Sequence, residues 1–215
     1  MSSRLTIDFF HDVVCCWCFN ISSRMRTLAP ELDLDIRHRT FVLQASPAEM
    51  AERWGTPAEA RETILEHWAV CRQVGDRPGL IDIGKMRNAQ FDYPHGWTAA
   101  LACKAAEHLG GQGAHWDMFD RIQTAHLTEA RNIAERSVLD GAARDIGLNA
   151  GDFAAAMADP RTADSVEADR QMARTLQVRS IPALIVRETG ARLVNGPTED
   201  LRAQLRAAAR LLART

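Results

Sequence analysis

Residues 4–18 read RLTIDFFHDVVCCWC, and this stretch decides the fold. Apolar side chains alternate through RLTIDFF, which predicts a strand with one face on a core. From Trp17 to about Leu28, apolar residues recur at helical spacing, and the AP pair at 29–30 is expected to end that helix. The cysteines of CCWC are therefore predicted to lie where a strand turns into a helix.

Strand and helix signals continue along the rest of the chain. In ELDLDIR, residues 31–37, apolar and charged residues alternate as in a second strand, so the chain opens as β-α-β. The TPAE motif at 56–59 is a capping box with proline at the first helical position, and it starts a run of helices. Further helices are predicted near 97–109, 113–127, 135–147, 150–158 and 161–176. Two short strands follow in IPALIV and ARLVNG, and Thr198 is expected to cap a last helix.

This order of elements predicts the fold class, which is α/β: a thioredoxin-like fold with an inserted all-helical domain. We assign residues 1–45 and 159–215 to the thioredoxin-like domain, and residues 46–158 to the helical insert domain. The β pattern breaks between the second and third strands. The insert is therefore expected to fold over the core and to bound the substrate groove.

The composition limits the classes of partner. The chain has 215 residues, 46% of them hydrophobic and 25% charged, with a formal net charge of -2, which gives no electrostatic case for binding nucleic acid or an anionic membrane. No apolar run near the start is long enough for a signal peptide, and none approaches a membrane-spanning length. We expect a cytoplasmic protein, in which thiols stay reduced and a paired cysteine motif is catalytic or metal-binding rather than structural.

Cys15 and Cys18 form a C-x-x-C motif at the predicted helix start. Free backbone N–H groups and the positive end of the helix dipole favour a thiolate at Cys15. Cys18 lies one helical turn further on and is placed to attack a mixed disulfide on Cys15. The pair is thus a candidate nucleophile and resolving cysteine, and this chemistry needs no cofactor.

The cysteines allow two other interpretations. A metal site could use the three clustered cysteines with His11, but structural zinc usually takes two separated ligand pairs, and no second C-x-x-C or C-x-x-H is present. Burial as small apolar side chains suits Cys71 and Cys103 in the predicted insert helices better than it suits the cluster. No metal site is therefore predicted.

Four motifs, DVVCCWC, FVL, AHLTEARNI and VRSIPALIV, resemble those of the DsbA-like thioredoxin-fold oxidoreductases, with the cytoplasmic FrnE type as the most similar subgroup. The resemblance implies that Ile181-Pro182 is the cis-proline loop, which offers backbone groups to an extended substrate peptide beside the reactive cysteine. Trp17 is expected to shield the disulfide or to provide an apolar contact. The sequence departs from the family at Cys16, where proline is usual.

The function predicted from these residues is thiol-disulfide exchange in the cytoplasm, with a protein or a small disulfide or thiol such as glutathione as partner. Kappa-class glutathione transferases and chromene-carboxylate isomerases are an alternative, but they carry serine where this chain has Cys15. A non-catalytic metal-binding or redox-sensing module is another alternative. His95 and His126 are candidates for lining the groove or for structural hydrogen bonds. The oligomeric state is not predicted.

Overall fold

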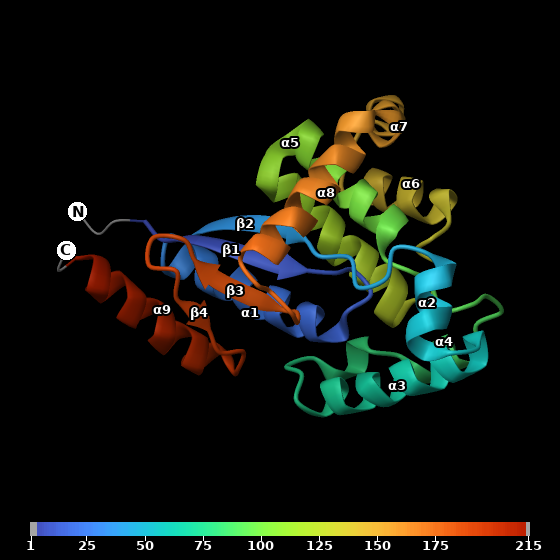
Figure 1. The fold of residues 1–215 in the computed structure, drawn as a ribbon, viewed down its shortest axis with the longest axis horizontal. Helices are drawn as coiled ribbons and strands as arrows, with labels where there is room; N and C mark the ends of the chain where they lie inside the picture. Colours follow the sequence, from blue (N-terminus) through green and yellow to red (C-terminus); the bar gives the residue numbers. More distant parts are fainter. Residues whose placement is uncertain (1–3, 214–215) are drawn as a thin grey trace.

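The computed structural model describes residues 4–213 and contains a four-stranded mixed sheet with the strand order β2-β1-β3-β4. The strands are β1 (Thr6–His11), β2 (Asp35–Thr40), β3 (Ala183–Val186) and β4 (Arg192–Leu193). Strand β1 pairs in parallel with β2 and antiparallel with β3, and β4 pairs antiparallel with β3. Figure 1 shows this sheet at one side of the molecule, with most of the helices between β2 and β3 gathered at the other.

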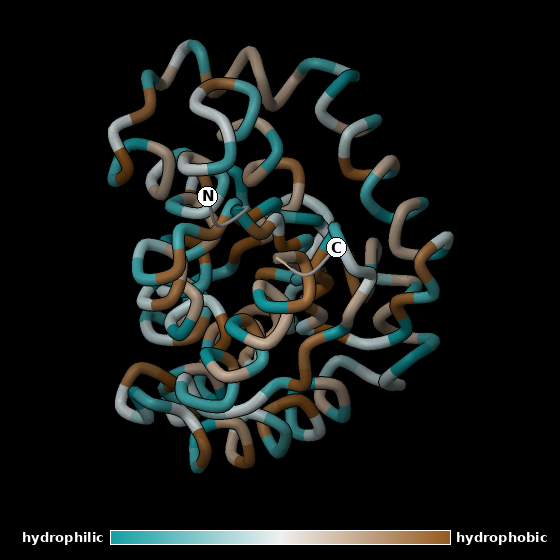
Figure 2. Tube along the Cα trace, turned by 90° about the vertical axis from the view of Figure 1, so that its left-hand side faces the viewer, coloured by the Kyte–Doolittle hydropathy of each residue, from teal (hydrophilic) through white to brown (hydrophobic). Residues whose placement is uncertain are grey.

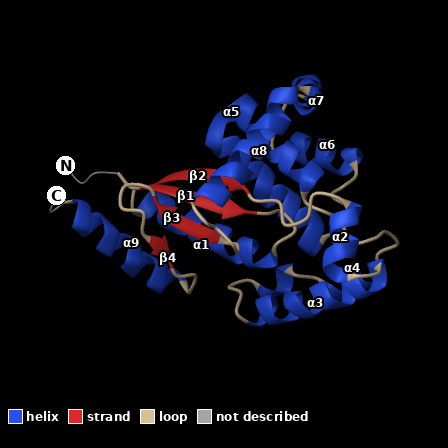
Figure 3. Ribbon diagram, viewed as in Figure 1, coloured by secondary structure: helices blue, strands red, loops and turns tan. Residues whose placement is uncertain are grey.

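Helices make up the remainder of the regular structure, as Figure 3 shows. The α-helices are α1 (Cys16–Glu31), α2 (Pro47–Trp54), α3 (Pro57–Gln73), α4 (Ile83–Arg87), α5 (Trp97–Gln123), α6 (Arg136–Asp145), α7 (Ala150–Ala158), α8 (Pro160–Thr175) and α9 (Thr198–Leu212). A 3₁₀ turn, η1 (Pro78–Leu80), precedes α4, and a π-helical turn, η2 (Thr124–Thr128), follows α5. The predicted fold class is confirmed: an α/β thioredoxin-like fold with a long helical insertion between β2 and β3.

Both faces of the sheet are covered by helices. Ile7 and Phe9 belong to the main apolar core, which includes inward residues of α1, α5 and α9. Phe10 points to the opposite face and packs with Ala173 of α8 and Ile185 of β3. Strand β1 is thus a central strand buried on both faces, rather than a strand with one face on a core. In Figure 2, turns of the outer helices alternate between hydrophobic and hydrophilic residues, as expected for helices with one inward face.

A buried carboxylate on β1 is matched by two arginines. Asp8 is 4% exposed, and its carboxylate accepts hydrogen bonds from Arg39 at 2.9 Å and Arg187 at 2.7 Å. Burial acts to raise the pKa of Asp8, but these two guanidinium groups outweigh it and lower that pKa. A charged residue on a central strand is therefore tolerated because β2 and the residue that follows β3 supply its partners.

Several helix ends differ from those predicted from the sequence. Helix α1 continues through Pro30 to Glu31, because a proline in the last turn removes only one helical hydrogen bond and Leu32 N still bonds to Leu28 O at 3.0 Å. The capping box at Thr56 is confirmed. Thr198, however, is the first residue of α9, and Pro197 occupies the cap position.

The long helix α5 contains a break that the sequence predicted as a helix end. Gly110 and Gly111 have non-helical backbone angles, so α5 consists of two helical segments on either side of them. The second segment leads into η2 and crosses toward the sheet, where Phe119 packs against Phe9 with ring centroids 6.2 Å apart. Within residues 4–213, the structure has no helix with the length and hydrophobicity to span a bilayer.

Candidate functional site

The register of β1 against β3 brings two distant loops together. Phe10 pairs with Ala183, so Pro182 lies beside the end of β1, where the chain turns toward Cys15. The Ile181–Pro182 peptide bond is cis. The strand pairing thus puts the VRSIP loop and the CCWC turn at the same end of the sheet.

Cys15 is the N-cap residue of α1. Its backbone is extended, with φ -90° and ψ 109°, and its carbonyl accepts hydrogen bonds from Cys18 N at 3.1 Å and Phe19 N at 3.3 Å. Gln123 of α5 donates to the same carbonyl at 2.9 Å, which ties the turn to the helical insertion. Cys15 is 8% exposed, whereas Cys18 is fully buried, so the first thiol is the more accessible of the pair.

Cys18 lies behind Cys15. Burial raises the pKa of the Cys18 thiol well above its usual value, and its hydrogen bond to the Cys15 thiol raises it further. Both cysteines are free thiols in this structure. The arrangement keeps the second thiol in contact with the first, as resolution of a mixed disulfide requires, and its raised pKa means that it must lose a proton before it attacks.

Asp12 is a site residue that the sequence analysis missed. It is 3% exposed, accepts a hydrogen bond from Leu43 N at 2.6 Å, and lies close enough to Cys18 to contribute to the raised pKa of that thiol. Burial in turn raises the pKa of Asp12. A buried carboxyl beside a protonated thiol is chemically able to accept its proton. The signal was the acidic residue three positions before Cys15, which the sequence analysis did not use.

A groove of about 550 Å³ opens next to the CCWC turn. It is lined by Trp17, Asn20, Ile21, Arg24, Val74, Ile181, Pro182, Asn195, Gly196 and Pro197. The three residues predicted to contact substrate, Trp17, Ile181 and Pro182, therefore share one groove. Trp17 is 37% exposed, and Val74 brings the end of α3 to the same groove.

Hydrogen bonds hold the walls of this groove in place. Arg24 donates to Asp76 at 2.7 Å, to Gly196 O at 2.8 Å and to Val74 O at 3.1 Å. Asn195 donates to Pro182 O at 2.7 Å. Because one arginine joins α1 to the segment after α3 and to the segment after β4, the groove is largely pre-formed. None of these polar wall residues was identified from the sequence.

The remaining candidates lie elsewhere. The Cys16 thiol forms a hydrogen bond with the free Cys71 thiol of α3. This hydrogen bond, together with burial, raises the pKa of Cys16 well above its usual value. Asn20 donates to the Cys71 sulfur at 3.2 Å. His95 lines a separate pocket of about 360 Å³, and His126 is buried with its Nε2 atom 2.9 Å from the Tyr93 hydroxyl.

Comparison with known proteins agrees with this geometry. The model of the DSBA-like thioredoxin domain matches residues 6–206. The chain has no match among the curated proteins. Three solved structures are similar over nearly their whole lengths.

The first is the cytosolic disulfide reductase DsbM from Pseudomonas aeruginosa, which is 26% identical, with 96% of this chain and all of that chain covered and a TM-score of 0.75. The second is the same reductase with glutathione, at a TM-score of 0.76. The third is a Nitrosomonas europaea protein provisionally described as a protein disulfide isomerase, which is 18% identical over 97% of this chain and 99% of that one, with a TM-score of 0.80. With the family model matched over nearly the whole chain, the protein belongs to the DSBA-like thioredoxin domain family of thiol-disulfide oxidoreductases.

Proposed function

We propose that this protein is a cytoplasmic thiol-disulfide reductase of the FrnE type, with Cys15 as nucleophile and Cys18 as resolving cysteine. The observation that carries the proposal is the placement of Cys15 as the N-cap of α1, with the Cys18 thiol buried behind it. The groove that contains Trp17 and Pro182 begins two residues away. Likeness to a reductase described as cytosolic supports the direction of electron flow and the compartment.

The reaction proceeds in two exchanges. The Cys15 thiolate attacks one sulfur of the substrate disulfide, forming a mixed disulfide and releasing the first substrate thiolate. Cys18 then loses its proton, with Asp12 as the nearby acceptor, and attacks the Cys15 sulfur. The products are a Cys15–Cys18 disulfide and the second substrate thiol, so two electrons pass from the protein to the substrate. Two external thiols return those electrons and regenerate the dithiol.

Glutathione disulfide and mixed disulfides of glutathione are the substrates that we propose. The DsbM structure with glutathione supports this choice, and a groove of about 550 Å³ is within the range of small-ligand sites. The Ile181–Pro182 segment lies directly before β3 and lines the groove, where its backbone groups are available to pair with the peptide part of such a substrate. Trp17 supplies an apolar surface at the same groove.

The test is reduction of a glutathione mixed disulfide by the reduced protein, followed by mass spectrometry of each cysteine. Cys15→Ser is expected to abolish exchange, and Cys18→Ala is expected to accumulate a glutathione adduct on Cys15. Cys103→Ala is the matched control, because Cys103 is fully buried and lies outside the groove. Full activity of Cys15→Ser would end the proposal.

A conjugation assay separates this function from glutathione transfer. With an electrophilic aromatic substrate, the wild-type protein is expected to show no conjugation above the uncatalysed rate, because Cys15 and Cys18 direct the site to disulfide exchange. Conjugation by the wild-type protein in the absence of disulfide exchange would instead favour a transferase.

A further inference from the structure

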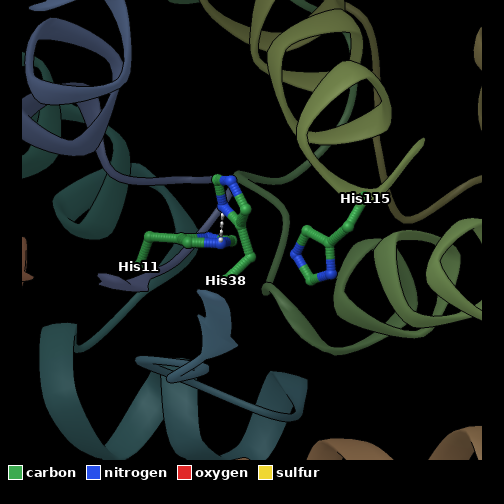
Figure 4. A group of neighbouring side chains, drawn as sticks. All are labelled: His11, His38 and His115. Atoms are coloured by element: carbon green, nitrogen blue, oxygen red, sulfur yellow. Dashed lines mark hydrogen bonds between the residues drawn. The ribbon is translucent and has the colours of Figure 1, made fainter. Parts of the chain in front are cut away.

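Three histidines outside the redox site meet in the core of the molecule. His11 ends β1, His38 lies in β2, and His115 lies in the second segment of α5. All three are buried, and one ring nitrogen from each lies within 4.8 Å of the others. Figure 4 shows the three rings converging from separate elements. The proposed redox reaction uses none of these side chains.

The ring nitrogens of this cluster are poorly satisfied by the rest of the protein. His38 Nδ1 and His11 Nε2 are 3.1 Å apart and share one hydrogen bond. Three other ring nitrogens, His11 Nδ1, His38 Nε2 and His115 Nε2, have no hydrogen-bond partner within residues 4–213. Buried polar atoms in proteins are normally paired, so the unpaired Nε2 of His115, within 4.8 Å of ring nitrogens of two other buried histidines, indicates a role beyond packing.

Glu107 determines which nitrogen of His115 carries the proton. Its carboxylate lies 2.7 Å from His115 Nδ1, which therefore donates, and His115 Nε2 keeps its lone pair. In Figure 4 a ring nitrogen of His115 faces the other two histidines. Lys104 holds the carboxylate in place by donating to Glu107 at 2.8 Å, and it also contacts Asp169 at 2.6 Å. A carboxylate that orients a histidine in this way is the usual neighbour of a metal ligand.

We propose that His11 Nε2, His38 Nδ1 and His115 Nε2 bind a divalent transition-metal ion, and that Zn²⁺ is the ion whose chemistry fits. Imidazole suits zinc, which binds it at about 2.0–2.1 Å, so two such ligands of a tetrahedral ion lie about 3.3 Å apart. The His11–His38 nitrogen separation of 3.1 Å is already close to that value. The His115 ring moves toward the ion to close the remaining gap.

Metal binding conserves the protons of the cluster. The proton shared between His11 and His38 moves to the far nitrogen of its own ring, so each imidazole remains neutral and all three lone pairs face the ion. Because the ligands come from β1, β2 and α5, the ion ties the helical insertion to the sheet. The site is closed to solvent, so the ion is taken up while the chain folds.

The first test is the metal content of refolded protein. The reduced wild-type chain is unfolded with a chelator, refolded with excess Zn²⁺ or Co²⁺, and freed of loose metal by gel filtration. We expect one ion per chain and, with Co²⁺, the visible absorption of tetrahedral nitrogen ligation without a thiolate charge-transfer band. Refolded wild-type protein without bound metal would overturn the proposal.

Variants then assign the ligands. His38→Phe and His115→Phe are expected to lose the ion, whereas His126→Gln, a change at a buried histidine outside the cluster, is expected to keep it. The double variant Cys15→Ser/Cys18→Ser is also expected to keep the ion, which separates this site from the redox site. Metal lost in the cysteine variant but retained in His115→Phe would overturn the assignment.

A variant of Glu107, the carboxylate that orients His115, tests the site if the phenylalanine variants do not fold. Glu107→Gln keeps all three ligands and weakens the orientation of His115; it also removes the ion pair with Lys104, which keeps its contact with Asp169. We expect its affinity for Zn²⁺ to fall about 10- to 100-fold. An affinity equal to that of the wild-type protein would contradict the proposed ligand set.

Discussion

Cys16 lies at the first position of α1, between Cys15 and Cys18 in sequence, but its thiol contacts Cys71 of α3. Its side chain therefore points away from the Cys15–Cys18 pair, as expected for adjacent residues on a helix. Because the backbone N–H of the first helical residue has no partner within its own helix, proline is compatible with this position.

We predict that Cys16→Pro keeps disulfide exchange and changes the free energy of unfolding by no more than about 1 kcal/mol. The main effect is expected on the redox potential of the Cys15–Cys18 pair, measured by equilibration with glutathione buffers. Loss of turnover with Cys18 intact would make Cys16 part of the exchange mechanism.

His126 links pH to stability. Burial lowers its pKa to about 3, whereas a histidine in the unfolded chain has a pKa of about 6.5. Below pH 6.5 the unfolded chain thus binds a proton at His126 that the folded chain does not bind. The contribution of this residue to the free energy of unfolding is therefore fully present above pH 6.5 and is lost as the pH falls toward about 3. At pH 5 the expected loss from this one group is about 2 kcal/mol.

We predict that His126→Gln removes this part of the acid sensitivity, as measured by urea unfolding at pH 7.5 and pH 5. Tyr93→Phe is the matched control, because it removes the hydroxyl partner of His126 and keeps the titrating ring. That variant is expected to be less stable at both pH values and to retain the wild-type difference between them. An unchanged difference in His126→Gln would contradict the prediction.

At the scale of elements, the start of α5 packs closely against the turn that precedes Cys15. Gly96 precedes this helix, and a Cβ atom there would overlap a carboxylate oxygen of Asp12. We predict that Gly96→Ala costs about 1–3 kcal/mol of stability, because Asp12 is buried and the backbone of Leu43 holds it in place.

Gly113→Ala is the matched control in the same helix. A Cβ atom at Gly113 meets no atom within 4 Å, and alanine favours the helical backbone over glycine by about 0.5–1 kcal/mol. This variant is expected to raise the midpoint of thermal unfolding while Gly96→Ala lowers it. Similar shifts for the two variants would show that the Asp12 contact is unimportant.

The elements that could be predicted from the sequence have local signals. The alternation in RLTIDFF, the capping box at Thr56 and the glycine pair at 110–111 depend on neighbouring residues, and each marks a real strand, cap or helix break. The burial of both faces of β1 could not be predicted, because the helix that covers the second face, α8, lies about 150 residues further along the chain. The π-helical turn η2 also lacked a local signal.

The residues of the candidate site also fall into those that the sequence reveals and those that only the fold brings together. Cys15, Trp17 and Cys18 are adjacent in the chain, so the sequence displays their spacing directly. Asn195 and Val74 reach the groove only through the fold, and no motif near either residue indicates it. The three clustered histidines are 27 and 77 positions apart in the chain, far beyond any ligand spacing that a sequence motif could reveal.

At the scale of the whole molecule, the sheet and the insertion share one apolar core. Residues of β1, α1, α3, α5 and α6 belong to a single buried cluster. We propose that residues 46–158 are an insert domain by topology, while residues 1–45 and 159–215 form the thioredoxin-like domain. The ends of these ranges, residues 1–3 and 214–215, lie outside the described residues. The helical region between β2 and β3 extends beyond residue 158, because it includes α8 (Pro160–Thr175). This helix covers the second face of the sheet.

We predict that the full chain unfolds in one cooperative transition, with coincident curves from circular dichroism and tryptophan fluorescence. A shortened chain that joins residue 45 to residue 159 is expected to remain unfolded, because it lacks Phe119, which packs on Phe9 and His11. Dispersed amide signals from that chain in NMR spectra would show an independently folding domain.

The pairing of β1 with β3 also has a consequence for synthesis of the chain on the ribosome. Strand β1 ends at His11, but the strand that covers its other edge begins only at Ala183. At a synthesis rate of about 5–20 residues per second, that edge stays open for on the order of 10 to 30 s. The nascent chain therefore carries a central strand with one edge unpaired, with Cys15 and Cys18 just behind it, through most of translation. An open strand edge is a template for pairing with other chains, so this interval is when the protein is most exposed to aggregation and to premature oxidation.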